Sequence, residues 1–258
     1  RQTVLWVSSH PELRSLNGHL QAAGITHLRA LGHRVLVSDL YALDWDPVLR
    51  REDGVHSATT LDQRFRVSED TRTAHREGTQ PADVARERAK LVAADAVVVQ
   101  FPLWWYGMPA ILKGWSDRVL VSGFAFGIDP DLGQRLRFEQ GPFVGKRALV
   151  VTTLGDRAKA IGPRGISGQL DQLLFGLLHG TLAYTGMSVL HPWALPSADH
   201  LDETRDPGSS LLERLDSLFT EAPIEYRHQF AGDYTEEWEL HHDVCPNETG
   251  LNVHIRRE

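Results

Sequence analysis

The most restrictive feature of this sequence is an apolar run that ends in an aromatic turn and continues as a helix. The run is Ala96–Gln100, the turn is Phe101–Tyr106, and Pro109 suits the first turn of the helix that follows. A strand, a sharp turn and a helix in this order form half of a parallel α/β unit. Ligands bind at the carboxyl ends of such strands, where this turn would lie. The alternative interpretation is a turn that only packs its rings beneath its own helix.

The same alternation of strand and helix patterns extends along most of the chain. Short apolar runs typical of strands buried on both faces occur at 4–7, 34–40, 96–100, 148–155 and 188–193. Helical patterns follow them at 20–31, 81–94, 109–120, 170–184 and 211–219. Parallel strands joined by helices make right-handed connections. We therefore predict an α/β fold with a doubly wound, five-stranded parallel sheet.

Two segments depart from this alternation. Residues 41–79 are polar and weakly periodic, as in a functional loop or a surface excursion. From Pro223 the charges and aromatic residues lose any clear period. We expect residues 1–222 to form one domain and residues 223–258 to form an arm that packs on the domain or on a dimer partner.

Charge and cysteine content exclude several classes of protein. The formal net charge is −7 and no dense Lys/Arg patch is interleaved with aromatics, which argues against a nucleic-acid partner. No apolar run approaches the roughly 20 residues of a membrane span. The sequence goes directly into a strand pattern, so we expect no signal peptide. A single cysteine, Cys245, excludes an internal disulfide framework and suits the cytoplasm.

Three loops follow predicted strands and should converge on one rim of the sheet. The first, 9–17, is rich in hydroxyls and opens a helix, as suits a phosphate; simple N-capping by Ser15 or Asn17 is the alternative. The second, 101–106, offers flat aromatic surfaces. The third, 152–155, offers hydroxyls and backbone N–H groups. Together these groups match what a flavin requires.

Other binding motifs are missing from the sequence. Neither the Gly-x-Gly-x-x-Gly fingerprint nor the phosphate-binding Gly-x-x-x-x-Gly-Lys-Ser/Thr loop is present. His241, His242, Cys245 and His254 match no zinc spacing, so we predict no metal. Cys245 has no basic neighbourhood in the sequence that would mark a nucleophile.

The stretch Phe101–Arg118 closely resembles the flavin loop of the NAD(P)H:quinone oxidoreductases of the DT-diaphorase type. The resemblance continues at 9–17, 38–42, 141–143 and 152–153, and it covers about residues 3–220. It implies a flavodoxin-like fold and a tightly held FAD rather than FMN. It further implies two-electron reduction of quinones or similar small aromatic acceptors by NAD(P)H, in a homodimer with the flavin near the interface.

Site residues carry over from this resemblance position by position. The cofactor-binding residues that it implies are His10, Ser15, Leu16, Asn17, Arg66, Pro102, Leu103, Trp104, Trp105, Tyr106, Thr152, Thr153, Leu154 and Gly155. Arg66 stands where the family has a glutamine. The implied substrate pocket comprises Trp105, Phe126, Gly127 and Ile128, with the last three facing the other subunit's flavin.

The loop 156–168 departs from the family pattern. Mammalian members have a tyrosine and a histidine here that steady charge on the reduced flavin, whereas this chain lacks the tyrosine and has Ser167 at the histidine position. Ser167 is therefore the predicted catalytic residue. Lys159 or Arg164 would be an alternative source of electrostatic stabilisation. Leu154 replaces a glycine, which makes the backbone beside the flavin less permissive.

Two other functions are compatible with the sequence. Some members of the wider family are ancillary flavoprotein subunits of ion-transport systems, and tail aromatics such as Trp238 would then face the transporter. An FMN electron carrier of the flavodoxin type would need a much shorter chain. The sequence does not identify the physiological acceptor, nor does it distinguish NADH from NADPH.

Overall fold

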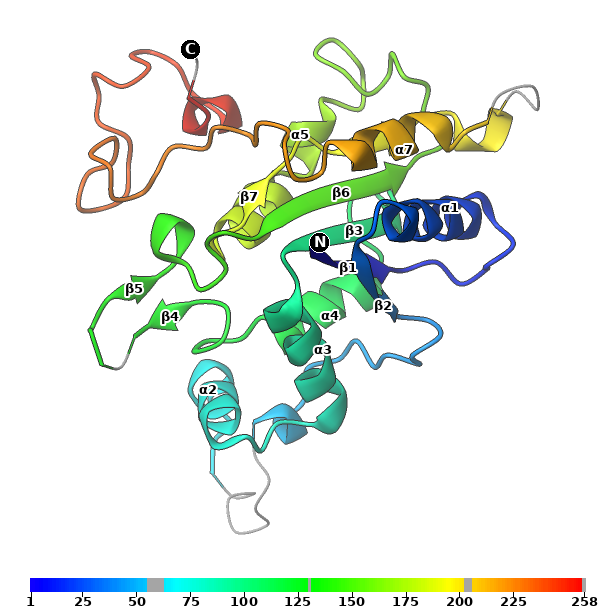
Figure 1. Cartoon of the computed structure of the whole chain (residues 1–258). Coiled ribbons are helices and arrows are strands. Elements are labelled where there is room, and N and C mark those ends of the chain that lie inside the picture. The colour runs from blue at the N-terminus through cyan, green and yellow to red at the C-terminus, as the bar shows by residue number, and fades with distance from the viewer. Residues whose placement is uncertain (55–62, 130, 202–205, 257–258) are drawn as a thin grey trace.

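A parallel sheet forms the centre of the computed structural model, which describes residues 1–54, 63–129, 131–201 and 206–256. The strand order is β2-β1-β3-β6, with β7 and β8 both paired to β6 at the edge (Figure 1). Its strands are β1 (Thr3–Ser8), β2 (Arg34–Asp39), β3 (Ala96–Pro102), β6 (Arg147–Thr153), β7 (Ser188–Val189) and β8 (Trp193–Leu195). The predicted doubly wound sheet with five strand positions is confirmed. The fifth position is split in two near Pro192, whose ring nitrogen cannot donate to a ladder.

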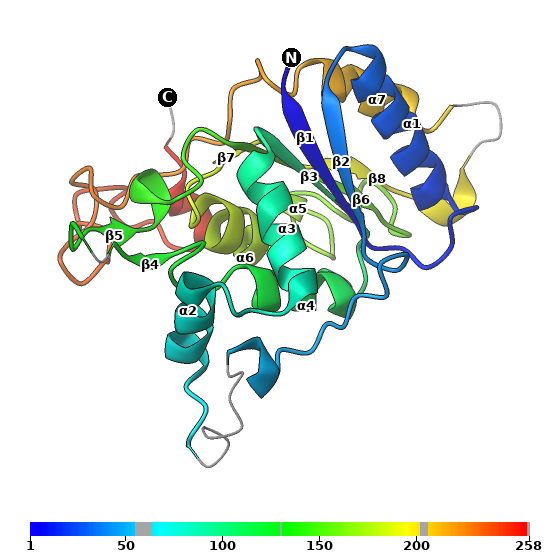
Figure 2. The same ribbon diagram turned by 60° about the horizontal axis from the view of Figure 1, so that its bottom comes forward.

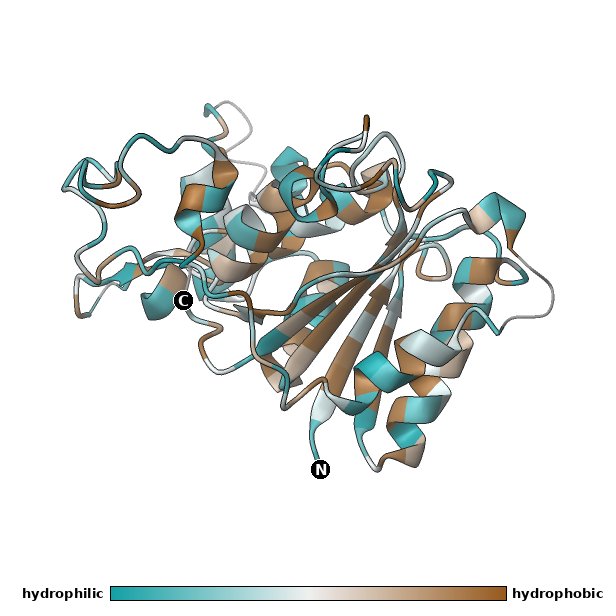
Figure 3. Cartoon of the chain, turned by 90° about the horizontal axis from the view of Figure 1, so that it is seen from above, coloured by the Kyte–Doolittle hydropathy of each residue, from teal (hydrophilic) through white to brown (hydrophobic). Residues whose placement is uncertain are grey.

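Helices cover both faces of this sheet (Figures 1 and 2). On one face lie α1 (Leu16–Ala30) and α7 (Ser209–Asp216); on the other lie α3 (Ala82–Ala93) and α4 (Ala110–Val119). Alternate strand residues serve the two faces, so that Trp6 packs with α1 and Leu5 packs with α3 and α4. Apolar residues accordingly follow the strands, while the outward faces of the helices are polar (Figure 3). Among the described residues, no helix is long and apolar enough to cross a membrane.

The helix predicted over 170–184 is interrupted. It consists of α5 (Leu170–Leu173), α6 (Phe175–Leu177) and a π-helical turn at Leu178–Ala183. Gly176 and Gly180 weaken a regular helix here, and the Thr181 hydroxyl donates to the Gly176 carbonyl oxygen at 2.9 Å. The apolar stripe identified the segment, but its spacing did not reveal the change in hydrogen-bond register.

The polar stretch 41–79 is more regular than the sequence indicated. It contains a 3₁₀ turn at Arg51–Asp53 and helix α2 (Val67–Glu77), which ends at the left-handed Gly78. Helix α2 buries only Thr71 and Ala74, so it has almost no apolar stripe to detect. Residues 55–62 lie outside the described residues. An antiparallel hairpin of β4 (Gly127–Ile128) and β5 (Arg135–Leu136) lies between α4 and β6.

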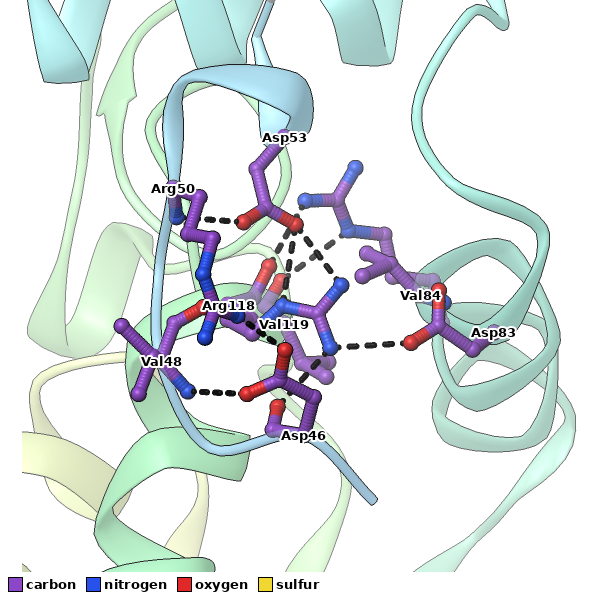
Figure 4. A network of polar contacts seen from close by, with 9 residues as sticks. Asp46, Val48, Arg50, Asp53, Asp83, Val84, Arg118 and Val119 are labelled. Atoms are coloured by element: carbon purple, nitrogen blue, oxygen red, sulfur yellow. Dashed lines mark hydrogen bonds and ion pairs between the residues drawn. The ribbon is translucent and has the colours of Figure 1, made fainter. Parts of the chain in front are cut away.

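A buried arginine ties this stretch to the helical layer (Figure 4). Arg118 of α4 donates to the carboxylates of Asp53 and Asp83, at 2.9 and 2.8 Å, and to the Asp46 carbonyl oxygen at 2.9 Å. Its guanidinium also lies over the Trp45 ring, 4.7 Å from the ring centroid. Close to this network, a Cβ atom on Gly114 would lie 2.1 Å from the Pro47 carbonyl oxygen, so that only glycine permits the approach.

The segment after Pro223 packs against the π-helical turn and closes on itself. Ile224 and Val253 are buried, and Tyr226 forms a bridge to Ile255. The His179 ring stacks on Phe175, with centroids 4.6 Å apart, and also contacts Tyr226. The division into a domain of residues 1–222 and an arm of residues 223–258 remains a prediction.

The neighbourhood of Cys245 corrects a sequence-based expectation. Arg227 donates to the Cys245 sulfur at 3.2 Å, so a cation does lie beside this thiol. The same guanidinium pairs with Asp233 and donates to the Val253 carbonyl oxygen. The two residues are 18 positions apart, and only the folding of the arm brings them together.

Replacing Arg118 with alanine should destabilise the protein strongly. The substitution leaves the buried Asp53 carboxylate without its cation, which typically costs about 3–5 kcal/mol. Lys113→Ala, which removes an exposed ion pair with Asp117 on the same helix, should cost below about 0.5 kcal/mol. Urea unfolding of both variants measures the free energies. Equal losses would contradict a structural role for the buried network.

Stability should also fall as the pH falls from about 6.5 towards 4. Burial lowers the pKa of His179 to about 4, with His254 adding a smaller effect. The unfolded chain therefore binds the proton first, and the stability present above pH 6.5 is lost on acidification. Between pH 7 and pH 5 this amounts to about 2 kcal/mol. Urea unfolding at both values checks it, and His179→Phe should lose a large part of this pH dependence.

Candidate functional site

The three predicted rim loops lie next to one another at the carboxyl ends of β1, β3 and β6. Pairing of Ser8 with Gln100, and of Phe101 with Thr152, brings the three strands to an end at the same level. The Ser9 amide donates to the Gln100 carbonyl oxygen at 3.1 Å, and the Leu103 amide donates to the Thr153 carbonyl oxygen at 2.8 Å. The predicted convergence of these loops is confirmed.

A series of buried side-chain hydrogen bonds, which we call the buried polar chain, holds the three rim loops together. The Trp6 indole N–H donates to Gln100 Oε1 at 2.8 Å, and Gln100 Nε2 donates to the Asn17 carbonyl oxygen at 2.8 Å. The Asn17 side-chain amide in turn donates to the Thr153 hydroxyl at 3.0 Å. Three strands and the first turn of α1 are thereby connected. Gln100 was not among the predicted site residues, although a polar residue that ends a buried apolar run is a detectable signal.

The aromatic turn is a tight hairpin with unusual backbone geometry. Trp104 and Gly107 exchange two backbone hydrogen bonds, at 3.2 and 3.1 Å. Between them, Trp105 and Tyr106 have φ of 51° and 58°, which is the left-handed region that glycine normally occupies in such turns. Each left-handed residue costs on the order of 1–3 kcal/mol. Strain of this kind is typical of functional sites.

This geometry directs the rings outward. The Trp105 side chain is 98% exposed, and Trp104 and Tyr106 are also exposed. A turn that only packs its rings would bury them, so the packing interpretation is wrong for these three residues. Phe101 and Pro102 are buried, and Leu103 packs against the core. Pro102 closes β3 as its last residue.

The first loop combines capping with unpaired hydroxyls. Ser15 is the N-cap of α1, and its side chain accepts from the Gly18 amide at 3.2 Å, as in the capping interpretation. His10 Nδ1 lies 3.0 Å from the Ser15 hydroxyl, and the His10 ring lies 6.5 Å from that of Trp104. The buried hydroxyls of Ser8 and Ser9 have no hydrogen-bond partner within the described residues.

Most polar groups of the third loop are already hydrogen-bonded within the protein, although its composition suggested that they would face a ligand. The Thr152 hydroxyl donates to the Phe101 carbonyl oxygen at 2.8 Å, and the Thr153 hydroxyl is engaged with Asn17. Leu154 is buried, and its amide donates to the Leu195 carbonyl oxygen. Only Gly155 of this loop is exposed. The two threonine side chains thus organise the rim from within.

Ser167 lies at the rim with a partner that sequence reasoning missed. Its hydroxyl donates to Asp156 Oδ2 at 2.7 Å and lies 3.1 Å from the Tyr106 hydroxyl. Tyr106 donates to the same carboxylate oxygen at 3.1 Å. An acidic residue directly after a strand-end glycine was the available signal. Lys159 and Arg164, the predicted alternative cations, are exposed on the same loop.

Several predicted residues do not join this rim within one chain. Arg66 is the N-cap of α2 and pairs with Glu69; α2 lies well apart from α1 in both views (Figures 1 and 2). Phe126 contacts Tyr184, with ring centroids 6.0 Å apart, and Gly127 and Ile128 form β4. The β4–β5 hairpin projects on the side away from α1 (Figure 2).

The rim has the properties that a flavin requires. Exposed aromatic rings provide a flat apolar wall, and the N-terminus of α1 with two unpaired hydroxyls provides an anion-binding corner. The exposed Gly155 lets a planar group approach the backbone. Among the residues that the structure describes, no three His, Cys, Asp or Glu side chains gather as they would around a metal ion.

Comparisons with known proteins agree with this geometry. A family model for the flavodoxin-like fold matches residues 2–217. The chain is 38% identical to a ribosyldihydronicotinamide dehydrogenase-like protein of Penicillium crustosum, covering 99% of this chain and 96% of that protein. It is 31% identical to NAD(P)H dehydrogenase [quinone] 1 of Rattus norvegicus, covering 97% and 92%. A Klebsiella pneumoniae structure assigned as a quinone reductase has a TM-score of 0.93 at 42% identity, covering 99% of this chain and all of that one.

Proposed function

Because the chain belongs to the flavodoxin-like fold family, we propose that it is a flavin-dependent NAD(P)H:quinone oxidoreductase. The names of the Rattus norvegicus relative and of the Klebsiella pneumoniae structure include quinone reduction, and both proteins align over nearly the whole chain. The chain is accordingly an oxidoreductase of the NAD(P)H dehydrogenase (quinone) class. The observation that carries the cofactor assignment is the outward-facing Trp105 ring, held by a strained turn between two other rim loops.

Different residues of the rim would bind different parts of a flavin. His10, Ser15, Leu16 and Asn17 surround the first turn of α1, where free N–H groups and partial positive charge suit a diphosphate. We propose FAD rather than FMN as the occupant of this corner, as the family resemblance implies. Bound flavin supplies the hydride chemistry, accepting two electrons from NAD(P)H and passing them to the acceptor.

The aromatic turn would form one wall of the flavin slot. Trp104, Trp105 and Tyr106 offer faces on which a planar ring system can stack while water is excluded. The backbone around Leu154 and Gly155 would meet the polar edge of the ring. The same slot would then serve the nicotinamide and a quinone or another small aromatic acceptor in turn.

A homodimer would complete this slot. Phe126, Gly127 and Ile128 lie away from the rim of their own chain, and Ile128 is exposed. A second copy placed with its hairpin over the rim would add these residues to the substrate pocket. Arg66 would reach a flavin in the same way. A cytoplasmic location is consistent with this proposal, since NAD(P)H is the donor.

The absorption spectrum of the purified protein tests the proposal. We expect the band of an oxidised flavin, which should bleach when NADH or NADPH is added without air and recover with a quinone. Chromatography of the released cofactor should give FAD. A colourless protein that binds no added FAD would contradict the proposal. A bound flavin with negligible quinone turnover would instead favour an ancillary role in ion transport.

Removal of the Trp105 ring should weaken flavin retention. A tryptophan face stacked on a planar ligand contributes enough that Trp105→Ala should raise the dissociation constant about tenfold or more. Val92→Ala, which truncates an exposed apolar side chain on α3, serves as the control and should retain its flavin. Titration of the flavin-free proteins with FAD measures both constants. Equal affinities would show that the ring does not stack on Trp105.

A further inference from the structure

Three oxygen-bearing side chains from two different loops meet at the edge of the aromatic turn. Tyr106 and Ser167 both donate to Asp156 Oδ2, at 3.1 and 2.7 Å, and their hydroxyl oxygens lie 3.1 Å apart. The three contacts form a closed triangle. Tyr106 belongs to the left-handed turn, whereas Asp156 and Ser167 lie near the two ends of the loop 156–168.

The loop is braced so that the carboxylate has a defined place. The Ser197 amide donates to the Asp156 carbonyl oxygen at 2.8 Å, which fixes the beginning of the loop. The Ser167 amide donates to the Ala160 carbonyl oxygen at 3.1 Å, and Ile161 bridges to Gly168 near its end. These bonds close the loop on itself. The Tyr106 hydroxyl then links this closed loop to the aromatic turn.

Hydrogen bonds from two hydroxyl groups stabilise the Asp156 carboxylate. No Lys, Arg or His forms an ion pair with it in the part of the chain that the structure describes, although Arg157 and Lys159 follow closely in sequence. Hydrogen bonds to an ionised acceptor are about twice as strong as neutral ones. Each hydroxyl has a single proton, and Asp156 takes both. With both protons directed at Asp156, neither hydroxyl would be left to donate to a bound acceptor.

We propose that Asp156 is a positioning residue, which clamps the loop 156–168 onto the aromatic turn through Tyr106 and Ser167. This inference rests on the proposed function, because the clamped loop would form a wall of the flavin and acceptor slot. It assigns Ser167 a positioning role in place of the catalytic role predicted from its alignment with a histidine. Through the Tyr106 hydroxyl, the clamp also holds the Tyr106 side chain in the direction that its left-handed backbone conformation gives it.

The clamp can be tested without flavin by trypsin. Lys159 is exposed within the loop and lies away from all three substitutions, so that cleavage after it reports opening of the loop. Asp156→Ala removes the acceptor of both charge-assisted hydrogen bonds and should raise the cleavage rate about tenfold or more. Asp156→Asn keeps a weaker acceptor and should give a smaller increase. Glu213→Gln, an exposed carboxylate on α7, is the matched control and should be cleaved at the unaltered rate.

Non-additivity distinguishes a clamp from general loosening of the loop. Tyr106→Phe should accelerate cleavage in the unaltered chain but add little when Asp156 is already alanine. Ser167→Ala should behave in the same way, and Ser167→Thr, which keeps the hydroxyl, should restore resistance. Thermal unfolding of each variant identifies any that fail to fold. Fully additive effects, or an unchanged cleavage rate in folded Asp156→Ala, would overturn the proposal.

The flavin-loaded enzyme separates positioning from catalysis. Asp156→Ala should raise KM for the quinone about tenfold while kcat falls by less than about threefold, since a misplaced wall weakens acceptor binding first. A loss of kcat of about a hundredfold or more in Ser167→Ala would instead make Ser167 a catalytic residue and overturn its positioning role. Because the trypsin experiment needs no cofactor, it decides on the clamp even if the protein binds no flavin.

Discussion

The buried polar chain from Trp6 through Gln100 and Asn17 to Thr153 holds the functional end of this molecule together. These groups lie between the sheet and α1, where an unpaired donor or acceptor would cost about 1–3 kcal/mol. The native arrangement pairs them with one another, so the first turn of α1 must lie over the ends of β1, β3 and β6. The position of the anion-binding corner relative to the aromatic turn follows from that requirement.

The aromatic turn differs from this polar chain, because its conformation is strained and its rings are exposed. Trp105 and Tyr106 adopt left-handed backbone conformations that favour glycine, and the cost leaves the rings facing solvent. A folding requirement alone would place glycine here and bury the aromatic residues. An exposed ring on a strained turn, beside unpaired serine hydroxyls, is the arrangement expected of a surface that a planar ligand covers. The function and the strain therefore have the same explanation.

The parts of the fold that were predicted correctly are those with strong local signals. Apolar runs identified the strands, and the order of strands and helices indicated the parallel sheet. The errors have a common cause, which is dependence on long-range contacts. Helix α2 has almost no apolar stripe and is held through its neighbours, and the strand at 188–193 breaks where Pro192 cannot pair. The cation beside Cys245 comes from Arg227, which only the folded arm brings near.

The sequence by itself determined the class of the sheet, the three loops at its rim and the family resemblance, because periodicity and strand-end chemistry are local properties. Tertiary structure decided which of the rim residues face outward. The side chains of Thr152 and Thr153 form hydrogen bonds inside the rim, whereas Trp105 is exposed. The Asp156 carboxylate accepts hydrogen bonds from both Tyr106 and Ser167. Tertiary structure also placed Phe126 and Arg66 away from the rim of their own chain. Such outcomes depend on which side chains from loops distant in sequence come into contact. The type of a residue alone does not determine its contacts in space.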